Sequence, residues 1–235
     1  TRVPRLMILA GLQRGDSLDC VKILLRAAGK LPGGTPGDRV AEEEWQCLEP
    51  LVERLLKVAV EKPQPPLDLT LDIGGTRLLA RLQPTGTGGL IDHSVMDLCV
   101  RDLLRFWFSH LCLNASPGGA AAVSTLMGPE RAVEFGAVEK PSDLLADMLH
   151  LYREGLTRPL PFFPRSAWAY ASAGGDPMKA ALKTWEGSRF SRGESEDTYN
   201  QLAFRDSDSD LLEGEFELLA QKVFSPLIAN TREVL

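Results

Sequence analysis

Gln83, Asp92 and Ser94 lie on two neighbouring predicted strands, where other residue types would build a metal-dependent nuclease site. Such a site needs a carboxylate on the first strand and an acid, any residue and a lysine on the second. Here the first strand offers Gln83, and Ser94 stands in the lysine position after Asp92. A neutral amide does not offset metal charge, and a hydroxyl carries no cation to stabilise developing negative charge. We therefore expect three degenerate positions, no catalytic residue and no metal ligand set.

A migrated site stays open as an alternative, because active-site acids can move along a strand. Asp72, Asp92 and either Glu49 or Glu53 are the candidate ligands. They would need to lie within about 5 Å of one metal-sized space, since a divalent cation requires several oxygen ligands at once. That geometry decides between an active nuclease and an inactive one.

Other signals for cofactor chemistry are weak. The three histidines are His93, His110 and His150, and no His-Glu-x-x-His motif or Cys–His cluster accompanies them. His110 falls on the apolar face of its helix, which favours a hydrogen-bonded structural histidine over a metal ligand. The glycines of residues 86–89 are not followed by Lys-Ser/Thr, so a hairpin turn suffices there. The sequence predicts no cofactor and no ATP hydrolysis.

A short basic stripe is the candidate DNA contact. Lys179, Lys183, Arg189 and Arg192 stand against the single acid Glu186. On a helix, the two lysines are one turn apart and share a face. A formal net charge of −6 argues against sequence-independent wrapping of DNA, which needs clustered cations. An ordinary solvated face remains the simpler interpretation of these residues.

Aromatic side chains gather in a proline-rich stretch at residues 160–170, which holds Phe162, Phe163, Trp168 and Tyr170. Such residues can stack on single-stranded bases. More often they pack a segment against the core or fill a pocket of a partner protein. We expect the second arrangement.

The elements that position these residues follow from hydrophobic periodicity and turn signals. We expect an antiparallel three-strand meander at 67–73, 76–83 and 90–95, with Gly74-Gly75 as its first turn. Two further strands are expected at 121–127 and 131–135. The expected helices are 17–28, 38–59 with a kink or break at Pro50, 96–114, 142–152, 176–186, 197–205 and 213–223. The fold class is α/β, a mixed sheet flanked by helices.

The order of elements between Leu78 and Asn114 is strand, glycine-rich turn, strand and long amphipathic helix. This order resembles the restriction-endonuclease-like core of PD-(D/E)xK nucleases. The resemblance implies a nuclease scaffold, on which residues 83, 92 and 94 would occupy the active-site positions.

Four segments, in order, are similar to one family. They read LRAAGKLP at 25–32, DLLRFW at 102–107, LPFFPRSAWAY at 160–170, and WEG at 185–187 followed by RGESED at 192–197. Together they resemble the C-terminal domain of RecC, the gamma subunit of exodeoxyribonuclease V.

This resemblance implies a nuclease-like domain without a catalytic role in the RecBCD helicase–nuclease. Its expected partners are RecB-like and RecD-like subunits, double-stranded DNA ends and the unwound strands. Its expected roles in double-strand break repair are subunit docking and the splitting or guiding of DNA strands. A plain interaction module with no DNA contact is a third possibility. A surface with an apolar patch but no basic stripe would indicate it.

Length and composition fit one nuclease-like domain over residues 1–235, with 1–36 as its helical N-terminal segment. The chain opens on Thr1 and its first motif belongs far along the resembled protein, so we expect a fragment of a longer chain. The four cysteines never approach Cys-x-x-Cys spacing, which favours a reduced, cytoplasmic protein. No apolar run reaches about 18 residues, so no membrane span is expected.

Overall fold

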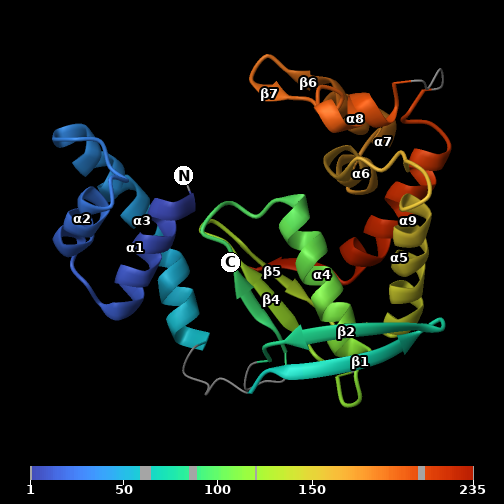
Figure 1. Ribbon diagram of the computed structural model, residues 1–235, viewed down its shortest axis with the longest axis horizontal. Helices are drawn as coiled ribbons and strands as arrows, with labels where there is room; N and C mark the ends of the chain where they lie inside the picture. The colour runs from blue at the N-terminus through green and yellow to red at the C-terminus, as the bar shows by residue number, and fades with distance from the viewer. Residues whose placement is uncertain (1, 59–64, 85–88, 120, 206–209, 235) are drawn as a thin grey trace.

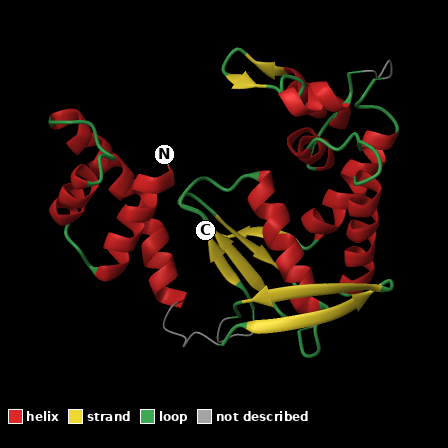
Figure 2. Ribbon diagram, viewed as in Figure 1, coloured by secondary structure: helices red, strands yellow, loops and turns green. Residues whose placement is uncertain are grey.

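The computed structural model describes residues 2–58, 65–84, 89–119, 121–205 and 210–234. Strands occupy its middle, with an N-terminal group of helices on one side and the later helices on the other (Figure 2). The architecture is therefore mixed α/β with sheets flanked by helices, as expected. No helix in the described ranges combines the length and apolar character that crossing a bilayer requires.

Three helices open the chain: α1 (Arg2–Arg14), α2 (Leu18–Ala27) and α3 (Thr35–Val58). The helix predicted at 17–28 is confirmed as α2, since the Ser17 side chain accepts a hydrogen bond from the Cys20 amide and Gly29 follows with φ 63°. Helix α1 was not predicted from the sequence. Pro50 does not divide α3 into two helices, because buried Leu48 and Leu51 hold both sides of it in one apolar cluster with α1 and α2.

This helical group is fixed to the sheet by two arginines. Arg54 donates from Nη2 to the carbonyl oxygens of Gly128 and Pro129, at 2.7 and 2.5 Å. Arg5 donates from Nη1 to the carbonyl oxygen of Val95 at 3.0 Å. Val95 itself, with Met127 and Ala132, belongs to the same buried cluster as the helices. Buried apolar side chains and arginine hydrogen bonds therefore both hold the N-terminal helices against the sheet.

A long hairpin follows, formed by β1 (Leu67–Ile73) and β2 (Thr76–Leu82). The two strands are antiparallel, and Ile73 pairs with Thr76 across the turn. Gly74 and Gly75 have φ values of 55° and 75°, which a two-residue turn of this hand requires and which glycine adopts without strain. The hairpin and its turn are as predicted.

The pairing predicted for the third strand of the meander is wrong. β3 (Ile91–His93) pairs in parallel with β4 (Ser124–Met127), and a single bridge between Pro84 and Leu90 links it to the hairpin. Gly89 explains the change, because a Cβ at this position would stand 1.8 Å from the Val123 carbonyl oxygen. The missing side chain lets the backbone approach β4. The predicted turn at 84–89 lies mostly outside the described residues.

The main sheet has the order β3-β4-β5-β8, with β5 at Ala132–Phe135 and β8 at Thr231–Val234. Its β3–β4 pair is parallel, and its other two pairs are antiparallel. Helix α4 (Val100–Asn114) crosses this sheet and also contacts β2 (Figure 1). Trp107 and Leu111 of α4 are fully buried in the same cluster as Leu126 and Phe135. Strand β8 was not predicted, since it begins directly after a helix.

The remaining helices are α5 (Pro141–Gly155), α6 (Pro164–Ala171), α7 (Pro177–Glu186), α8 (Thr198–Ala203) and α9 (Glu215–Ala229). Helices α5, α6 and α7 all begin with proline, which suits the first helical position. The cap predicted at Asp176 is confirmed, because its carboxylate accepts from the Lys179 amide at 3.1 Å. The cap predicted at Ser142 is wrong, since α5 starts one residue earlier. A small hairpin, β6 (Gly187–Ser188) and β7 (Ser191–Arg192), follows α7.

The aromatic stretch packs inward, as predicted. Phe162 stacks on Phe224 with ring centroids 5.8 Å apart, and Trp168 meets the same ring edge-on at 5.4 Å. Phe163 is buried, and Tyr170 contacts Phe216 at 5.8 Å. These rings join α6 to α9 and are not available for base stacking.

Candidate functional site

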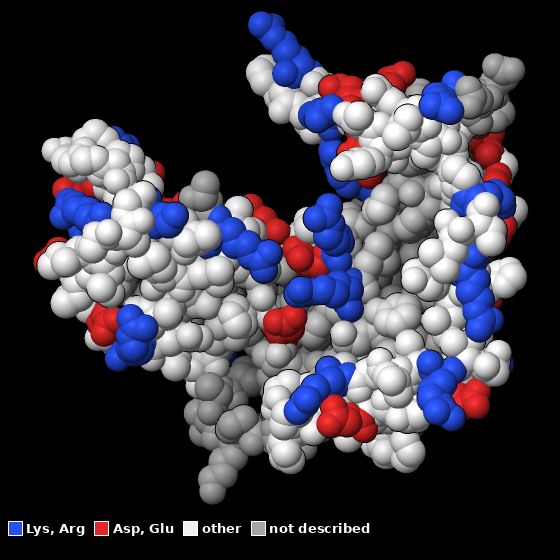
Figure 3. Space-filling view, viewed as in Figure 1, with Lys and Arg blue, Asp and Glu red and all other residues white. Residues whose placement is uncertain are grey.

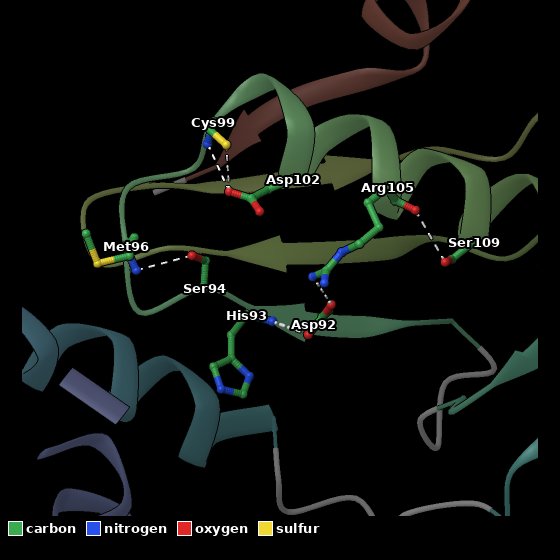
Figure 4. Close-up of polar contacts among 8 residues, drawn as sticks. All are labelled: Asp92, His93, Ser94, Met96, Cys99, Asp102, Arg105 and Ser109. Atoms are coloured by element: carbon green, nitrogen blue, oxygen red, sulfur yellow. Dashed lines mark hydrogen bonds and ion pairs between the residues drawn. The ribbon is translucent and has the colours of Figure 1, made fainter. Parts of the chain in front are cut away.

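The residues predicted to mark a degenerate nuclease site lie on β3 and the helix beside it. Asp92 Oδ2 accepts a hydrogen bond from Arg105 Nη2 on α4 at 3.1 Å (Figure 4). Its other oxygen accepts from the His93 amide at 2.8 Å. The two charged side chains are 46% and 61% exposed, so this pair contributes little to stability. A guanidinium therefore stands beside the one acid of the predicted site.

The fold brings two of the three predicted positions together. Gln83 and Asp92 line a depression of about 280 Å³, together with Leu82, Phe106 and Ser109. Ser94 does not line it. Its Oγ accepts from the Met96 amide at 3.1 Å (Figure 4). Its own amide donates to the Met127 carbonyl oxygen. Ser94 therefore serves the connection from β3 to α4.

The alternative acids are not brought together. Asp72 pairs with Arg77 near the hairpin turn, while Leu82 beside the depression ends the same strand β2. At a strand rise of about 3.4 Å per residue, Arg77 and Leu82 are roughly 17 Å apart. Within the described part of the chain, no three His, Cys, Asp or Glu side chains form a group that could hold a metal ion. The proposed set of Asp72, Asp92 and Glu49 or Glu53 is therefore not assembled.

The basic stripe lies on α7 and the β6–β7 hairpin. Lys179, Lys183, Arg189 and Arg192 are all exposed. Arg192 is engaged by Glu196, through an ion pair at 3.7 Å and a hydrogen bond to the Glu196 carbonyl oxygen. Lys and Arg side chains project from the end of the molecule that carries this hairpin (Figure 3). The role of these four residues in DNA binding stays a prediction.

Comparison with known proteins places these features in a family. A family model described as the RecC C-terminal domain matches residues 5–175. The chain belongs to the RecC C-terminal domain family. It is 25% identical over 236 residues to the RecBCD enzyme subunit RecC of Escherichia coli strain K12, which covers 94% of the chain and 21% of that protein. The chain thus spans about a fifth of the length of this relative.

A second relative is the RecBCD enzyme subunit RecC of Mycolicibacterium smegmatis. It is 30% identical over 124 residues, covering 48% of the chain and 11% of that protein. The motifs at 25–32, 102–107 and 160–170 fall within the residues that match the family model, and the motif that starts at Trp185 lies beyond them. The predicted membership of the RecC C-terminal domain family is confirmed.

One feature of this RecC C-terminal domain was missed by sequence reasoning. A cleft of about 810 Å³ lies where the first turns of α4 face Pro164, Arg165 and the segment 194–200. Arg101, Arg105 and Arg165 line it. The i, i+4 spacing of the two α4 arginines was visible in the sequence. The approach of Arg165, 60 residues later, was not.

Proposed function

We propose that this chain is a non-catalytic, restriction-endonuclease-like domain of a RecC-type subunit. On this proposal it acts in a cytoplasmic complex of the RecBCD type during double-strand break repair. Its partners are RecB-like and RecD-like subunits, the DNA end and the unwound strands. Membership of the RecC C-terminal domain family supports the assignment to the complex. We also propose that residues 1–235 act as one domain, because the N-terminal helices and the sheet share a buried cluster.

The main support for the non-catalytic role is the set of groups around Asp92. A metal site needs several oxygen ligands and a lysine-like cation aimed at the reacting phosphate. Here Gln83, which lines the same depression as Asp92, offers a neutral amide, and Arg105 donates to one of the Asp92 carboxylate oxygens. Ser94 is hydrogen-bonded to the backbone away from the depression. The arrangement supports a scaffold whose metal chemistry is absent.

The purified chain is therefore expected to show no magnesium- or manganese-dependent cleavage of linear DNA. In a complex reconstituted with RecB-like and RecD-like subunits, Asp92→Ala should leave DNA cleavage unchanged, because no His, Cys, Asp or Glu among the described residues joins Asp92 in a group that could hold a metal ion. Release of labelled nucleotides from linear duplex DNA measures both effects.

Restoring the motif is not expected to restore activity. Gln83→Asp with Ser94→Lys supplies the missing groups, but the residues around them have had no reason to keep the arrangement that would orient them. Arg105→Ala can be added to free Asp92 from its pair. Cleavage by the purified chain that disappears with Asp92→Ala would overturn the proposal.

Strand guiding is proposed for the basic stripe, within an acidic molecule. The net charge of −6 repels a polyanion, and the stripe offers few phosphate contacts. We expect the chain alone to bind duplex DNA weakly, with a dissociation constant of about 1–100 µM at physiological salt. Lys183→Glu with Arg189→Glu should weaken that binding and flatten its salt dependence, measured by fluorescence anisotropy.

Arg39→Glu is the matched control, because Arg39 is an exposed arginine of α3 and lies outside the stripe. Binding that survives the double substitution would place the DNA contact elsewhere. Submicromolar binding with a steep salt slope would contradict the weak association itself. No measurable binding of DNA by the parent chain would favour a protein-only interaction module.

A further inference from the structure

The cleft beside α4 is built from two rigid walls. One wall is the first three turns of α4, with Val100, Leu104 and Phe108 as its apolar part. The other is the start of α6 and the segment from β7 to α8. Helix α4 is held from behind by fully buried Trp107 and Leu111, so its wall is preformed. Figure 3 shows the hollow beneath the β6–β7 hairpin, with Lys and Arg side chains along one edge.

Two acids line the cleft, and both are occupied as helix caps. Glu194 accepts from the amides of Arg165 and Ser166, at 3.1 and 2.7 Å, and from the Ser166 hydroxyl at 2.8 Å. Asp197 accepts from the amides of Tyr199 and Asn200. Their charge is therefore directed toward backbone N–H groups, which is where a carboxylate at a helix start is most stable.

The arginines of the cleft keep donors for a ligand. Arg101 is exposed and makes no ion pair with any described residue. Arg105 uses one Nη on Asp92 at 3.1 Å, and Arg165 donates to the Arg192 carbonyl oxygen and the Ser191 hydroxyl. Since a guanidinium carries five N–H donors, each of the three retains donors. Three cations with directional donors favour an anionic ligand that offers several oxygen atoms.

The aromatic residues indicate what else the ligand carries. Phe108 lines the cleft and is half-buried, one helical turn after Leu104 and Arg105. Tyr199 lies on α8, next to Asn200 of the cleft lining, and is 82% exposed. Aromatic side chains in a positively charged groove are the combination that binds single-stranded nucleic acid, because every base has a π-face. A duplex keeps its bases stacked inside, and an acidic peptide offers no regular series of π-faces.

We propose that this cleft binds a short segment of single-stranded DNA. Its phosphates contact Arg101, Arg105 and Arg165, and a base packs on Phe108. The cleft volume of about 810 Å³ falls within the range of small-ligand sites, which suits a few nucleotides. The inference rests on the proposed function, in which unwound strands reach this domain, and adds a site separate from the α7 stripe.

The test uses the full-length protein and a dye-labelled oligothymidylate of about 15 nucleotides, within the length that single-strand binding sites cover. Arg101→Glu with Arg105→Glu should weaken binding at least about 10-fold at low salt. The slope of log K against log salt should fall by about 1.4, because each lost phosphate contact contributes about 0.7. Arg101→Lys should keep the slope, and Arg39→Glu on α3 is the control with the same change of charge per site.

Stacking has its own readout. Phe108→Leu keeps the apolar packing of α4 but removes the ring, and is expected to weaken binding by about 5- to 100-fold without changing the salt slope. An oligonucleotide carrying 5-iodouracil should crosslink to the peptide that holds Phe108.

If the Arg101→Glu, Arg105→Glu variant bound oligothymidylate with the affinity of the parent protein, the proposed binding site in the cleft would be wrong. A crosslink that maps only to α7 would also contradict it. If a polyglutamate peptide bound more strongly than oligothymidylate, the cleft would be a site for an acidic protein segment and not for DNA. None of these outcomes measures DNA cleavage or assembly with the partner subunits, so the proposed function is judged separately.

Discussion

Phe163→Ala is expected to lower the free energy of unfolding by about 3–5 kcal/mol, the cost of emptying a fully packed aromatic site. Phe163 is 1% exposed and stands directly before α6. Its ring centroid lies 4.2 Å from that of Trp185 on α7 and 5.6 Å from that of Phe204 at the end of α8. Phe216 of α9 is the next ring, at 6.2 Å. One side chain therefore joins four helices. The cavity that Phe163→Ala leaves would close only if all four helices shifted at once.

Urea unfolding followed by tryptophan fluorescence measures this loss, since Trp185 reports on the same cluster. Phe190→Ala removes the same side chain from a position that is 93% exposed, and should change the free energy of unfolding by no more than about 0.5 kcal/mol. If Phe163→Ala costs less than about 1 kcal/mol, the C-terminal helices are not organised around this ring. The α6–α8 wall of the cleft would then not be rigid.

Local signals in the sequence were sufficient for several elements. Asp176-Pro177 specifies a helix start through one side-chain hydrogen bond and one fixed φ, and the helix begins there. Gly74-Gly75 specifies a two-residue turn that other residues adopt only with strain, and the hairpin has it. Both features depend on neighbours a few residues away, which is why they could be predicted.

Strand pairing over longer distances could not be predicted. The segment at 90–95 has the strand character expected of it, but its partner is set by contacts with residues about 35 positions later. The Leu90 amide donates to Ser124 Oγ at 3.0 Å, and the Thr125 amide donates to the Leu90 carbonyl oxygen at 2.8 Å. Nothing in the periodicity of 90–95 distinguishes these bonds from bonds to β2.

The candidate site divides in the same way. Exposure of the α7 lysines follows from the polarity of one helix face, and the structure agrees. The pair between Asp92 and Arg105 depends on how β3 lies against α4, and the cleft depends on α6 approaching from far along the chain. A candidate for a degenerate motif can be proposed from residue types alone. The groups that surround it require the tertiary structure.

The last prediction concerns His110, which is fully buried on α4 between Trp107 and Phe135. Its Nε2 is 2.8 Å from the Gly136 carbonyl oxygen, which can only accept, so Nε2 carries the proton. Its Nδ1 then accepts from the Ser124 hydroxyl at 2.9 Å. The structural role predicted for His110 is confirmed. Burial lowers the pKa of His110 below its ordinary value of about 6.5, and the hydrogen bond to Gly136 offsets only part of this effect.

The direction of the pH effect follows. Because the folded pKa lies below the unfolded one, the unfolded chain binds more protons in the window between the two values. The contribution of neutral His110 is complete above about pH 6.5 and is lost progressively as the pH falls toward the folded pKa. Over that window the free energy of unfolding should fall by up to about 1.4 kcal/mol per pH unit.

Urea unfolding between about pH 7.5 and pH 5 measures this slope, and His110→Gln isolates it from the carboxylates that titrate in the same range. At pH 7.5 the variant should cost about 1–3 kcal/mol, because it leaves Ser124 or Gly136 without its partner. Toward pH 5 that cost should shrink, since the variant has no buried group left to protonate. His150→Gln, at an exposed position on α5, should keep the slope of the parent protein. If parent and His110→Gln lose stability in parallel, the buried imidazole is not the group that couples proton binding to this fold.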